Sequence, residues 1–254
     1  GLSTEMRVIF GLLLTLAPAL ALVSAVNIAS STWERVRTNP KKRTLRVTGS
    51  ASKRIESDLI TWSGGIESVA DDRTQAYKTL SSHTALARQF LMDNGIPAPE
   101  IRVSSASTRR LIDTEVIGTG PERLQREVFR GWSATQAITV QSHQVALVEK
   151  ASREITSLLE RGVSISSHAP AYHYTKLGEV KVDMLAEASA NAHERAQRIV
   201  QAAGGADIGP LWTADMGVIN INPANSTATS WEGNNDKSSF EKDIMTIVHL
   251  TFEL

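Results

Sequence analysis

The sequence contains no cysteine among its 254 residues. Disulfides, thiolate nucleophiles, cysteine-bound zinc and iron–sulfur clusters are therefore excluded, and cysteine usage does not indicate a redox compartment. A surplus of charge is also missing, because 27 basic residues balance 27 acidic ones. Proteins dedicated to nucleic acids normally carry a basic surplus, so nucleic acid is not an expected partner. Since 41% of the residues are hydrophobic, the chain can bury a core.

Common catalytic motifs are missing too: HExxH, the Walker loop, GxGxxG and GxSxG. Ser50 and Lys53 match S-x-x-K, but we expect them in a polar turn at a strand end, whereas that hydrolase motif opens a helix. His168 and His173 flank a proline at an odd spacing, which favours two separate polar histidines over a metal site. A hydrolase using these residues is the weakest hypothesis. We expect no enzymatic activity, no catalytic or metal-binding residue and no cofactor.

The N-terminal segment is the most unusual part of the sequence. No charged side chain occurs between Val8 and Trp33, and Val8–Ile28 is almost continuously apolar. A helix of that length rises about 31 Å, close to the hydrocarbon thickness of a bilayer. We therefore expect a membrane anchor over residues 1–29, followed by a basic linker over residues 30–43. The side chains expected to hold the anchor in the bilayer are Val8, Phe10, Leu13, Leu16, Leu20, Val23 and Trp33.

Two alternatives to an anchor stay open, a cleaved signal peptide and a buried helix of a soluble protein. A signal peptide would use Arg7 as its basic start and Ala19–Ala21 or Val23–Ala25 as its cleavage site. Orientation is also open. Basic residues of the linker follow the apolar run while only Arg7 precedes it, which favours a cytoplasmic domain, but the signal-like features favour export.

Residues 44–254 predict one α+β domain with antiparallel or mixed sheets and packed helices, including a split βαββαβ unit. Helices are expected between Asp72 and Asn94, over 143–161 with an inner stripe that includes Ile155 and Leu159, and over 176–203. Alanines along the last helix indicate a close approach to a sheet. Strands are expected over 44–50, 59–69, 100–106, 131–142, 163–169, 209–221 and 242–254. Residues 108–130 are polar and are expected to form an excursion between strands.

Tryptophans supply candidate contact residues. Trp62, Trp132 and Trp212 lie on predicted strands, where core packing is the usual role. Trp231 differs, because it lies in a polar stretch, residues 222–239, that is expected to be a long exposed loop. Such a loop offers little core to bury an indole, so contact with a partner, a neighbouring subunit or the membrane is expected there. We expect Trp231 and Phe240 to lie at a contact between subunits.

Several stretches, taken in order over residues 43–254, resemble the SIMPL-domain family of bacterial envelope proteins, which includes periplasmic immunogens. The most distinctive is Tyr172–Leu177 with the helix that follows it. The others are Thr48-Gly49 with Asp58, Asn94-Gly95-Ile96, Glu100-Ile101, Gly131–Gln136, Gly204, Gly209, Leu211, Met216–Val218 and the closing strand. Residues 108–130 match the family poorly.

The resemblance implies an α+β fold and an exported domain, so we expect a single-pass inner-membrane protein whose folded domain lies in the periplasm. It also implies self-association, because periplasmic relatives form ring or channel-like assemblies, and roles in envelope stress or integrity. It supplies no catalytic residues. The leading hypothesis is therefore a non-enzymatic, membrane-anchored protein that forms a homo-oligomeric ring. The alternative is a monomeric binding module for a protein or lipid partner, with an apolar patch near Trp132 or Tyr172–Tyr174.

Overall fold

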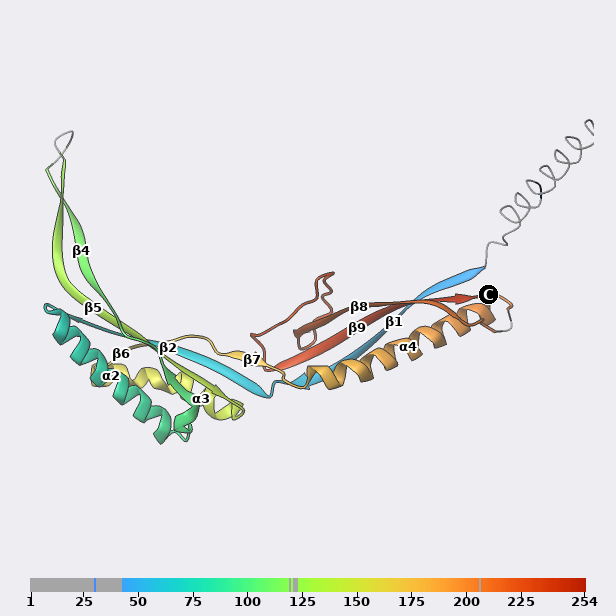
Figure 1. Ribbon diagram of the computed structural model, residues 1–254, viewed down its shortest axis with the longest axis horizontal. Helices are drawn as coiled ribbons and strands as arrows, with labels where there is room; N and C mark the ends of the chain where they lie inside the picture. The colour runs from blue at the N-terminus through green and yellow to red at the C-terminus, as the bar shows by residue number, and fades with distance from the viewer. Residues whose placement is uncertain (1–29, 31–42, 119, 121–122, 206) are drawn as a thin grey trace, which may run out of the picture. The chain divides into compact units, whose positions relative to one another are not determined.

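The computed structural model describes Ser30 and residues 43–118, 120, 123–205 and 207–254 (Figure 1). The expected anchor, with its residues Val8 to Val23, and Trp33 lie outside the described residues. Within the described residues, no helix is long and apolar enough to cross a membrane. Arg46–Phe252 forms a single unit.

The chain has a mixed α+β fold with antiparallel sheets, and three α-helices lie in the described part. The elements are β1 (Thr44–Glu56), β2 (Leu59–Ala70), α2 (Arg73–Asp93), β3 (Ile101–Val103), β4 (Ser107–Ile117), β5 (Leu124–Ser142), α3 (Val145–Glu154), β6 (Ser164–Ser167), β7 (Ala171–His173), α4 (Leu177–Ala202), β8 (Leu211–Pro223) and β9 (Glu241–Glu253). Short 3₁₀ helices cover Ala98–Glu100 and Ile155–Arg161.

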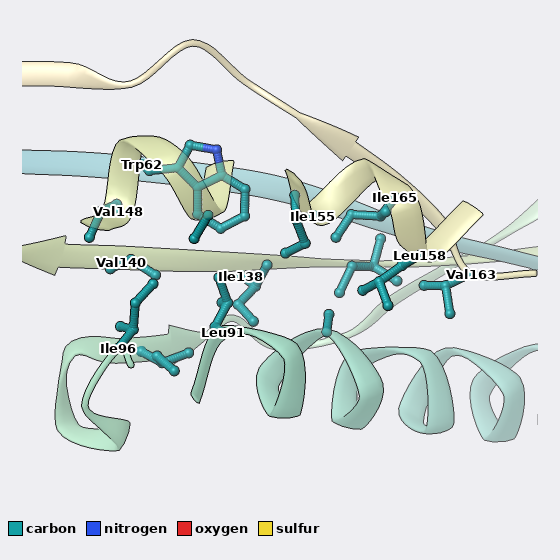
Figure 2. Close-up of a cluster of buried hydrophobic side chains, with 14 of the residues drawn as sticks. Trp62, Leu91, Ile96, Ile138, Val140, Val148, Ile155, Leu158, Val163 and Ile165 are labelled. Carbon is teal, nitrogen blue, oxygen red and sulfur yellow. The ribbon is translucent and has the colours of Figure 1, made fainter. Parts of the chain in front are cut away.

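The larger sheet has the strand order β3-β5-β2-β6, with β4 and β7 paired to β5 and β2. In chain order the elements run β2, α2, β3, β4, β5, α3 and β6, so the expected β-α-β-β-α-β sequence has the additional strand β4 between its second and third strands. Alternate residues of β2 are buried, among them Ile60, Trp62 and Ile66, because that face of the strand meets α2 and α3. Figure 2 shows this core, in which the Trp62 indole lies beside Val148 and Val140.

The ends of α2 follow the signals in the sequence. Asp72 is the N-cap, and its carboxylate accepts a hydrogen bond of 3.0 Å from the backbone N–H of Gln75. The helix ends at Asp93 with Asn94 as its C-cap, and Gly95 adopts φ +90°, a conformation that glycine reaches without strain. Both predicted ends of this helix are confirmed.

The prediction for the second helix is wrong in one respect. Leu159 was expected on the inner stripe, but it is 54% exposed, whereas Leu158 is 1% exposed. The reason is that the α-helix ends at Glu154 and continues as a 3₁₀ helix. With three residues per turn, the side chain that returns to the face of buried Ile155 is three positions later, not four.

The prediction of an excursion between strands over residues 108–130 is also wrong. These residues form an antiparallel ribbon in which β4 pairs with β5 from Ser107↔Thr135 to Ile117↔Leu124. In contrast, β2 pairs with β5 only from Trp132 onward. The outer part of the ribbon therefore has no third strand among the described residues, and it covers no core. Without a buried face, its sequence lacks the apolar alternation that predicts a strand.

The smaller sheet has the order β1-β9-β8, and α4 packs against it. A Cβ atom on Gly49 of β1 would lie 2.6 Å from the Cβ of Ala192, so helix and strand approach as closely as the alanine pattern predicts. Strand β1 extends to Glu56, so Ser50 and Lys53 lie inside a strand and not in a turn. Trp212 was expected in a core, but it lies in β8 with 52% of its surface exposed.

Candidate interaction surfaces

The residues weighed for catalysis do not form one site. Ser50 and Lys53 are both exposed, and a separation of three on a strand directs them to opposite faces. The Nδ1 atom of His168 is within 3.3 Å of the Ser63 hydroxyl, while His173 lies on β7. Burial is the main reason that the pKa of His173 lies below its usual value. No group of three or more potential ligands able to hold a metal ion occurs among the described residues.

The loop between β8 and β9, residues 224–240, carries both Trp231 and Phe240. Two buried side chains of β8 hold this loop in place. The Asn220 side-chain oxygen accepts hydrogen bonds from the backbone N–H groups of Ser230, at 2.9 Å, and Asn234, at 3.0 Å. The Asn222 amide donates to the carbonyl of Ala228 at 2.7 Å. Because both asparagines are at most 2% exposed, the bonds form away from water and fix the loop against the strand.

Trp231 lies in this fixed loop with 96% of its surface exposed. Its turn is closed by a hydrogen bond of 3.2 Å from Gly233 to the carbonyl of Ser230. Gly233 has φ +82°, and a Cβ there would lie 2.7 Å from the carbonyl oxygen of Ile219. A large apolar ring is thus held outward by a turn that has little freedom to fold it back.

Phe240, unlike Trp231, makes contacts within its own chain. Its ring meets the Tyr172 ring edge-on with centroids 6.2 Å apart, and its carbonyl accepts a hydrogen bond of 2.9 Å from Ser57. Only 37% of the residue is exposed. The side chain therefore has an internal packing role on Tyr172 and offers a smaller free surface than Trp231.

Lys242, which the sequence analysis did not single out, fixes the far end of the loop. The residue is 1% exposed, and its Nζ donates hydrogen bonds to the carbonyls of Tyr172, at 3.1 Å, and Asp236. Burial would raise the pKa of Asp236, but hydrogen bonds from Ser238 and Ser239 and the charge of Lys242 lower it to about 2. The position of Lys242 in the strand indicates its burial, because it lies on the same strand face as the buried residues Ile244, Thr246 and Val248.

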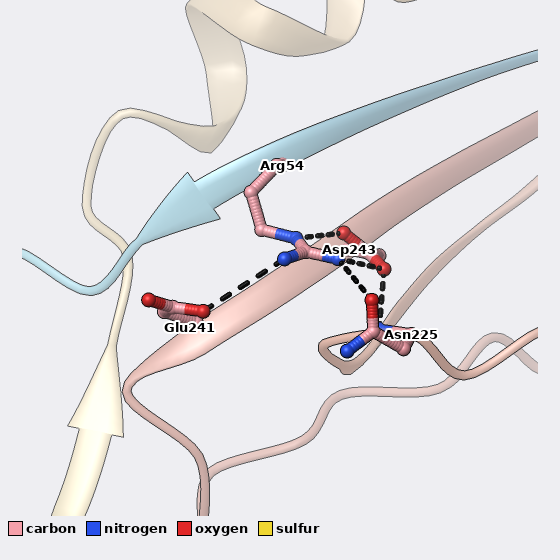
Figure 3. A network of polar contacts seen from close by, with 4 residues as sticks. All are labelled: Arg54, Asn225, Glu241 and Asp243. Carbon is pink, nitrogen blue, oxygen red and sulfur yellow. Dashed lines mark hydrogen bonds and ion pairs between the residues drawn. The ribbon is translucent and has the colours of Figure 1, made fainter.

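The near end of the loop is held by Arg54 of β1 (Figure 3). Its Nε donates to Asp243 at 2.5 Å, and one terminal nitrogen donates to the Asn225 side chain at 2.8 Å. The Asn225 backbone N–H also donates to Asp243, at 2.7 Å. The hydrogen bond from Arg54 is the main reason that the pKa of Asp243 lies below its usual value. Three segments that are distant in sequence thus meet at one polar network.

Strand β8 carries further exposed apolar side chains beside the loop. These side chains are Leu211, Trp212, Met216 and Val218, which are exposed by 53%, 52%, 69% and 40%. The strand is at the edge of its sheet. The surrounding sequence is acidic, because residues 199–236 include Asp207, Asp215, Glu232 and Asp236 but no lysine, arginine or histidine.

The ribbon of β4 and β5 has two unlike faces. One face, which we define as the ribbon face, has three large exposed apolar residues: Ile112, Val116 and Phe129, exposed by 46%, 55% and 45%. Ile112 lies opposite Phe129 in the ladder, and the Arg110 guanidinium lies 5.1 Å from the Phe129 ring centroid.

The other face of the ribbon carries ion pairs and, at its outer end, the exposed apolar pair Ile117 and Leu124. Arg130 is 3.1 Å from Asp113 and 2.6 Å from Glu115, and Arg126 lies 3.5 Å from Glu115. These charges satisfy one another on a surface that water can reach. The apolar side chains on the ribbon face have no comparable cover among the described residues.

A third surface is an open depression of about 520 Å³ on the larger sheet, on the face opposite α2 and α3. Hydroxyl groups dominate its lining, which includes Ser104, Ser105, Ser107, Thr135, Ser164 and Ser166. The apolar patch expected near Trp132 and Tyr172 is not exposed. Trp132 is half-buried with the Arg73 guanidinium 5.4 Å from its ring centroid, and Tyr172 is 8% exposed.

Comparison with known proteins gives one informative match. A family model described as "SIMPL: Protein of unknown function (DUF541)" matches residues 45–246, which is most of the chain. None of the curated proteins compared with the chain matches it. The match includes β8 and the loop that carries Trp231.

Proposed function

The chain belongs to the SIMPL (DUF541) family, whose function is unknown, and from this premise we propose that it is a non-enzymatic, membrane-anchored envelope protein that assembles into a homo-oligomeric ring. The apolar run Val8–Ile28 supplies the proposed inner-membrane anchor, with the folded domain in the periplasm. Assembly of anchored copies in one bilayer raises their effective concentration, so weak contacts between domains suffice. Envelope integrity or stress tolerance is the proposed setting.

The observation that carries self-assembly is the exposure of Trp231 on a loop fixed at three places. Fixed exposed aromatics are the side chains that contribute most to protein interfaces, since burying them costs little conformational entropy. Buried polar contacts at Asn220 and Lys242, together with the exposed Arg54 network, hold this loop without using the indole. The rest of the fold does not need Trp231, which favours a role in binding another molecule.

The test is the molar mass of the full chain in mild detergent, measured by light scattering. We expect a discrete multimer for the wild type and a loss of at least half of that mass for Trp231→Ala. Tyr77→Ala is the matched control, because Tyr77 is also exposed, by 52%, but lies on α2. A shortened chain beginning at Ser31 shows whether the domain assembles without the anchor. Monomers in both forms would refute the ring.

The second candidate is a monomeric binding module, and the hydroxyl-rich depression favours it. Its lining offers donors and acceptors in a solvent-facing depression, which suits a polar partner more than a lipid chain. The two candidates separate cleanly. A monomeric wild type that binds a partner, with that binding lost in Ser166→Leu, supports the module. A wild-type multimer whose mass does not change in Ser166→Leu supports the ring.

A further inference from the structure

We infer that the hydroxyl-rich depression on the larger sheet is a binding site for a neutral saccharide chain. The inference deepens the second candidate, the binding module, because it names the class of ligand, and it does not depend on self-assembly. The depression has a volume of about 520 Å³, which is within the range of small-molecule binding sites.

Four polar side chains of the lining form a row across the sheet, one from each of four neighbouring strands. Thr135 of β5 lies opposite Ser107 of β4 on one side and opposite Glu67 of β2 on the other. Glu67 in turn lies opposite Ser164 of β6. Because neighbouring strands are about 4.8 Å apart, the row spans about 14 Å. It therefore offers hydrogen-bonding groups along the length of an extended ligand.

Four hydroxyl groups of the lining have no hydrogen-bond partner within the described part of the chain: those of Ser105, Ser107, Thr135 and Ser164. In the free protein, water can satisfy them. Each hydroxyl group donates one hydrogen bond and accepts others. A ligand that replaces the water must itself donate and accept at closely spaced positions, and the hydroxyl groups of a sugar chain do both.

Glu67 is the one charged residue of the lining. One of its carboxylate oxygens accepts a hydrogen bond of 2.5 Å from the hydroxyl group of Ser133, which is fully buried. Arg109 lies 3.9 Å from the same oxygen. The second oxygen is left to accept hydrogen bonds from a ligand. Such bonds from hydroxyl groups to a carboxylate are stronger than bonds between two neutral groups.

The composition of the lining disfavours anionic and lipid ligands. It contains no lysine, arginine or histidine, and the Glu67 carboxylate repels an anionic chain. Its two large aliphatic residues, Ile66 and Ile165, are 1% and 5% exposed and belong to the core on the other face of the sheet. A lipid chain would therefore find little apolar surface in the depression.

Gly65 and its cross-strand neighbour Ala137 give the depression its depth, because neither has a side chain larger than a methyl group. Glycine weakens the interior of a strand, and the backbone at Gly65 does not have the positive φ that favours glycine. A Cβ there would meet only side chains, Ser166 Oγ at 2.9 Å and His168 Cε1 at 3.8 Å. The fold does not need a glycine at this position, whereas a ligand lying on the sheet needs the space.

The experiment measures the binding of two neutral tetrasaccharides, chitotetraose and maltotetraose, to the full chain by saturation-transfer NMR titration. The detergent is a polyoxyethylene ether, because a maltoside would itself present sugar to the site. Tetragalacturonic acid and a glycine–serine octapeptide are the comparison probes, one anionic and one an extended peptide. We expect at least one neutral tetrasaccharide to bind the wild type, and each comparison probe to bind more weakly.

Two variants fill the depression, Gly65→Val and Ala137→Val. We expect each to weaken saccharide binding about tenfold or more, because the branched side chain occupies the space of the ligand. Gly65→Val is also expected to raise the thermal midpoint, because valine is favoured in strands and glycine is not. A glycine with a purely structural role would lower the midpoint instead. Thr61→Val, on the same face of β2 but outside the depression, is the matched control and is expected to bind as the wild type does.

The inference is overturned if neither neutral tetrasaccharide binds the wild type. Unchanged binding in either valine variant overturns it too, provided that circular dichroism shows the variant to be folded. Tighter binding of the anionic probe or of the peptide would assign the depression to that class of ligand and not to saccharides.

The molar mass of the same sample separates this inference from the proposed function. A multimer that binds a tetrasaccharide refutes the monomeric module and leaves the saccharide site in place. A monomer that binds no tetrasaccharide leaves the module in place and refutes the saccharide site.

Discussion

Lys242 and Asp236 form an ion pair beneath the surface, with the ammonium Nζ 3.6 Å from a carboxylate oxygen and the lysine side chain 1% exposed. The same ammonium group donates to the carbonyl of Tyr172. One buried cation thus joins the end of the Trp231 loop, the start of β9 and strand β7. A buried charge with this many acceptors is costly to remove, because the carbonyls of Tyr172 and Asp236 lose the ammonium donor and the Asp236 carboxylate loses its countercharge.

Lys242→Ala is therefore expected to lower the free energy of unfolding by about 3 kcal/mol. Lys242→Met keeps most of the volume and isolates the loss of the charge, so a smaller loss is expected than for alanine. Urea denaturation of the purified protein measures both. Lys181→Ala on the exposed side of α4 is the control, with a change below about 0.5 kcal/mol. If Lys242→Ala matched that control, Lys242 would not hold the loop.

Acid is expected to destabilise the fold through Asp236. Its pKa is about 2 in the folded protein, below the usual carboxyl value. A lowered pKa means that the unfolded chain binds the proton first, so the stabilisation is present above about pH 4 and is lost as the pH falls towards 2. The contribution is about 2 kcal/mol. The pKa of Asp243 is lowered too, chiefly by the hydrogen bond from Arg54, and acts in the same direction.

Urea midpoints at pH 7, 5, 4 and 3 measure this dependence. Asp236→Asn is expected to be less stable at pH 7 and to lose less stability between pH 5 and 3 than the wild type. The lowered pKa of His173, due mainly to burial, also makes acid destabilising, but at a higher pH. A pH profile of Asp236→Asn that is parallel to the wild type would contradict the assignment to Asp236.

Much of the fold could be predicted where a buried face leaves a periodic pattern. The alternation of β2 and the stripe of α2 are visible because one side of each meets a core, and the capping residue Asp72 marks where α2 begins. The ribbon was missed for the opposite reason. Its residues Ile112, Val116 and Phe129 face no core of their own chain, so apolar positions are sparse and the pattern is indistinct.

The candidate site was predicted only in part. A tryptophan in a stretch of Asn, Ser, Thr and Gly stands out in a sequence, so Trp231 could be singled out. The burial of Asn220, Asn222 and Lys242 could not be inferred from residue type, because polar side chains are buried only when distant partners satisfy them. Their partners, such as Ser230 and Tyr172, become known only once the chain is folded.

The change from α-helix to 3₁₀ helix after Glu154 buries Leu158 and leaves its neighbour Leu159 exposed. Leu158→Ala removes a side chain that is 1% exposed and is expected to cost about 3 kcal/mol of unfolding free energy. Leu159→Ala removes one that is 54% exposed and is expected to cost less than about 1 kcal/mol. Urea denaturation of both variants side by side measures the difference. An α-helix continuing through these residues would reverse the order.

The close approach of α4 to its sheet predicts opposite effects for two glycine substitutions. In Gly49→Ala the new methyl would meet the backbone carbonyl of Ala188 and lie 2.6 Å from the Cβ of Ala192, so helix and strand must separate. Overpacking of this kind costs about 1–3 kcal/mol, and a backbone atom cannot move aside as a flexible side chain does. Gly178→Ala, at an exposed position of α4 with open space around its Cβ, is expected to stabilise by about 0.5 kcal/mol, because alanine restricts the unfolded chain. Thermal denaturation should therefore move the two midpoints in opposite directions. A neutral Gly49→Ala would mean that α4 does not contact β1 this closely in solution.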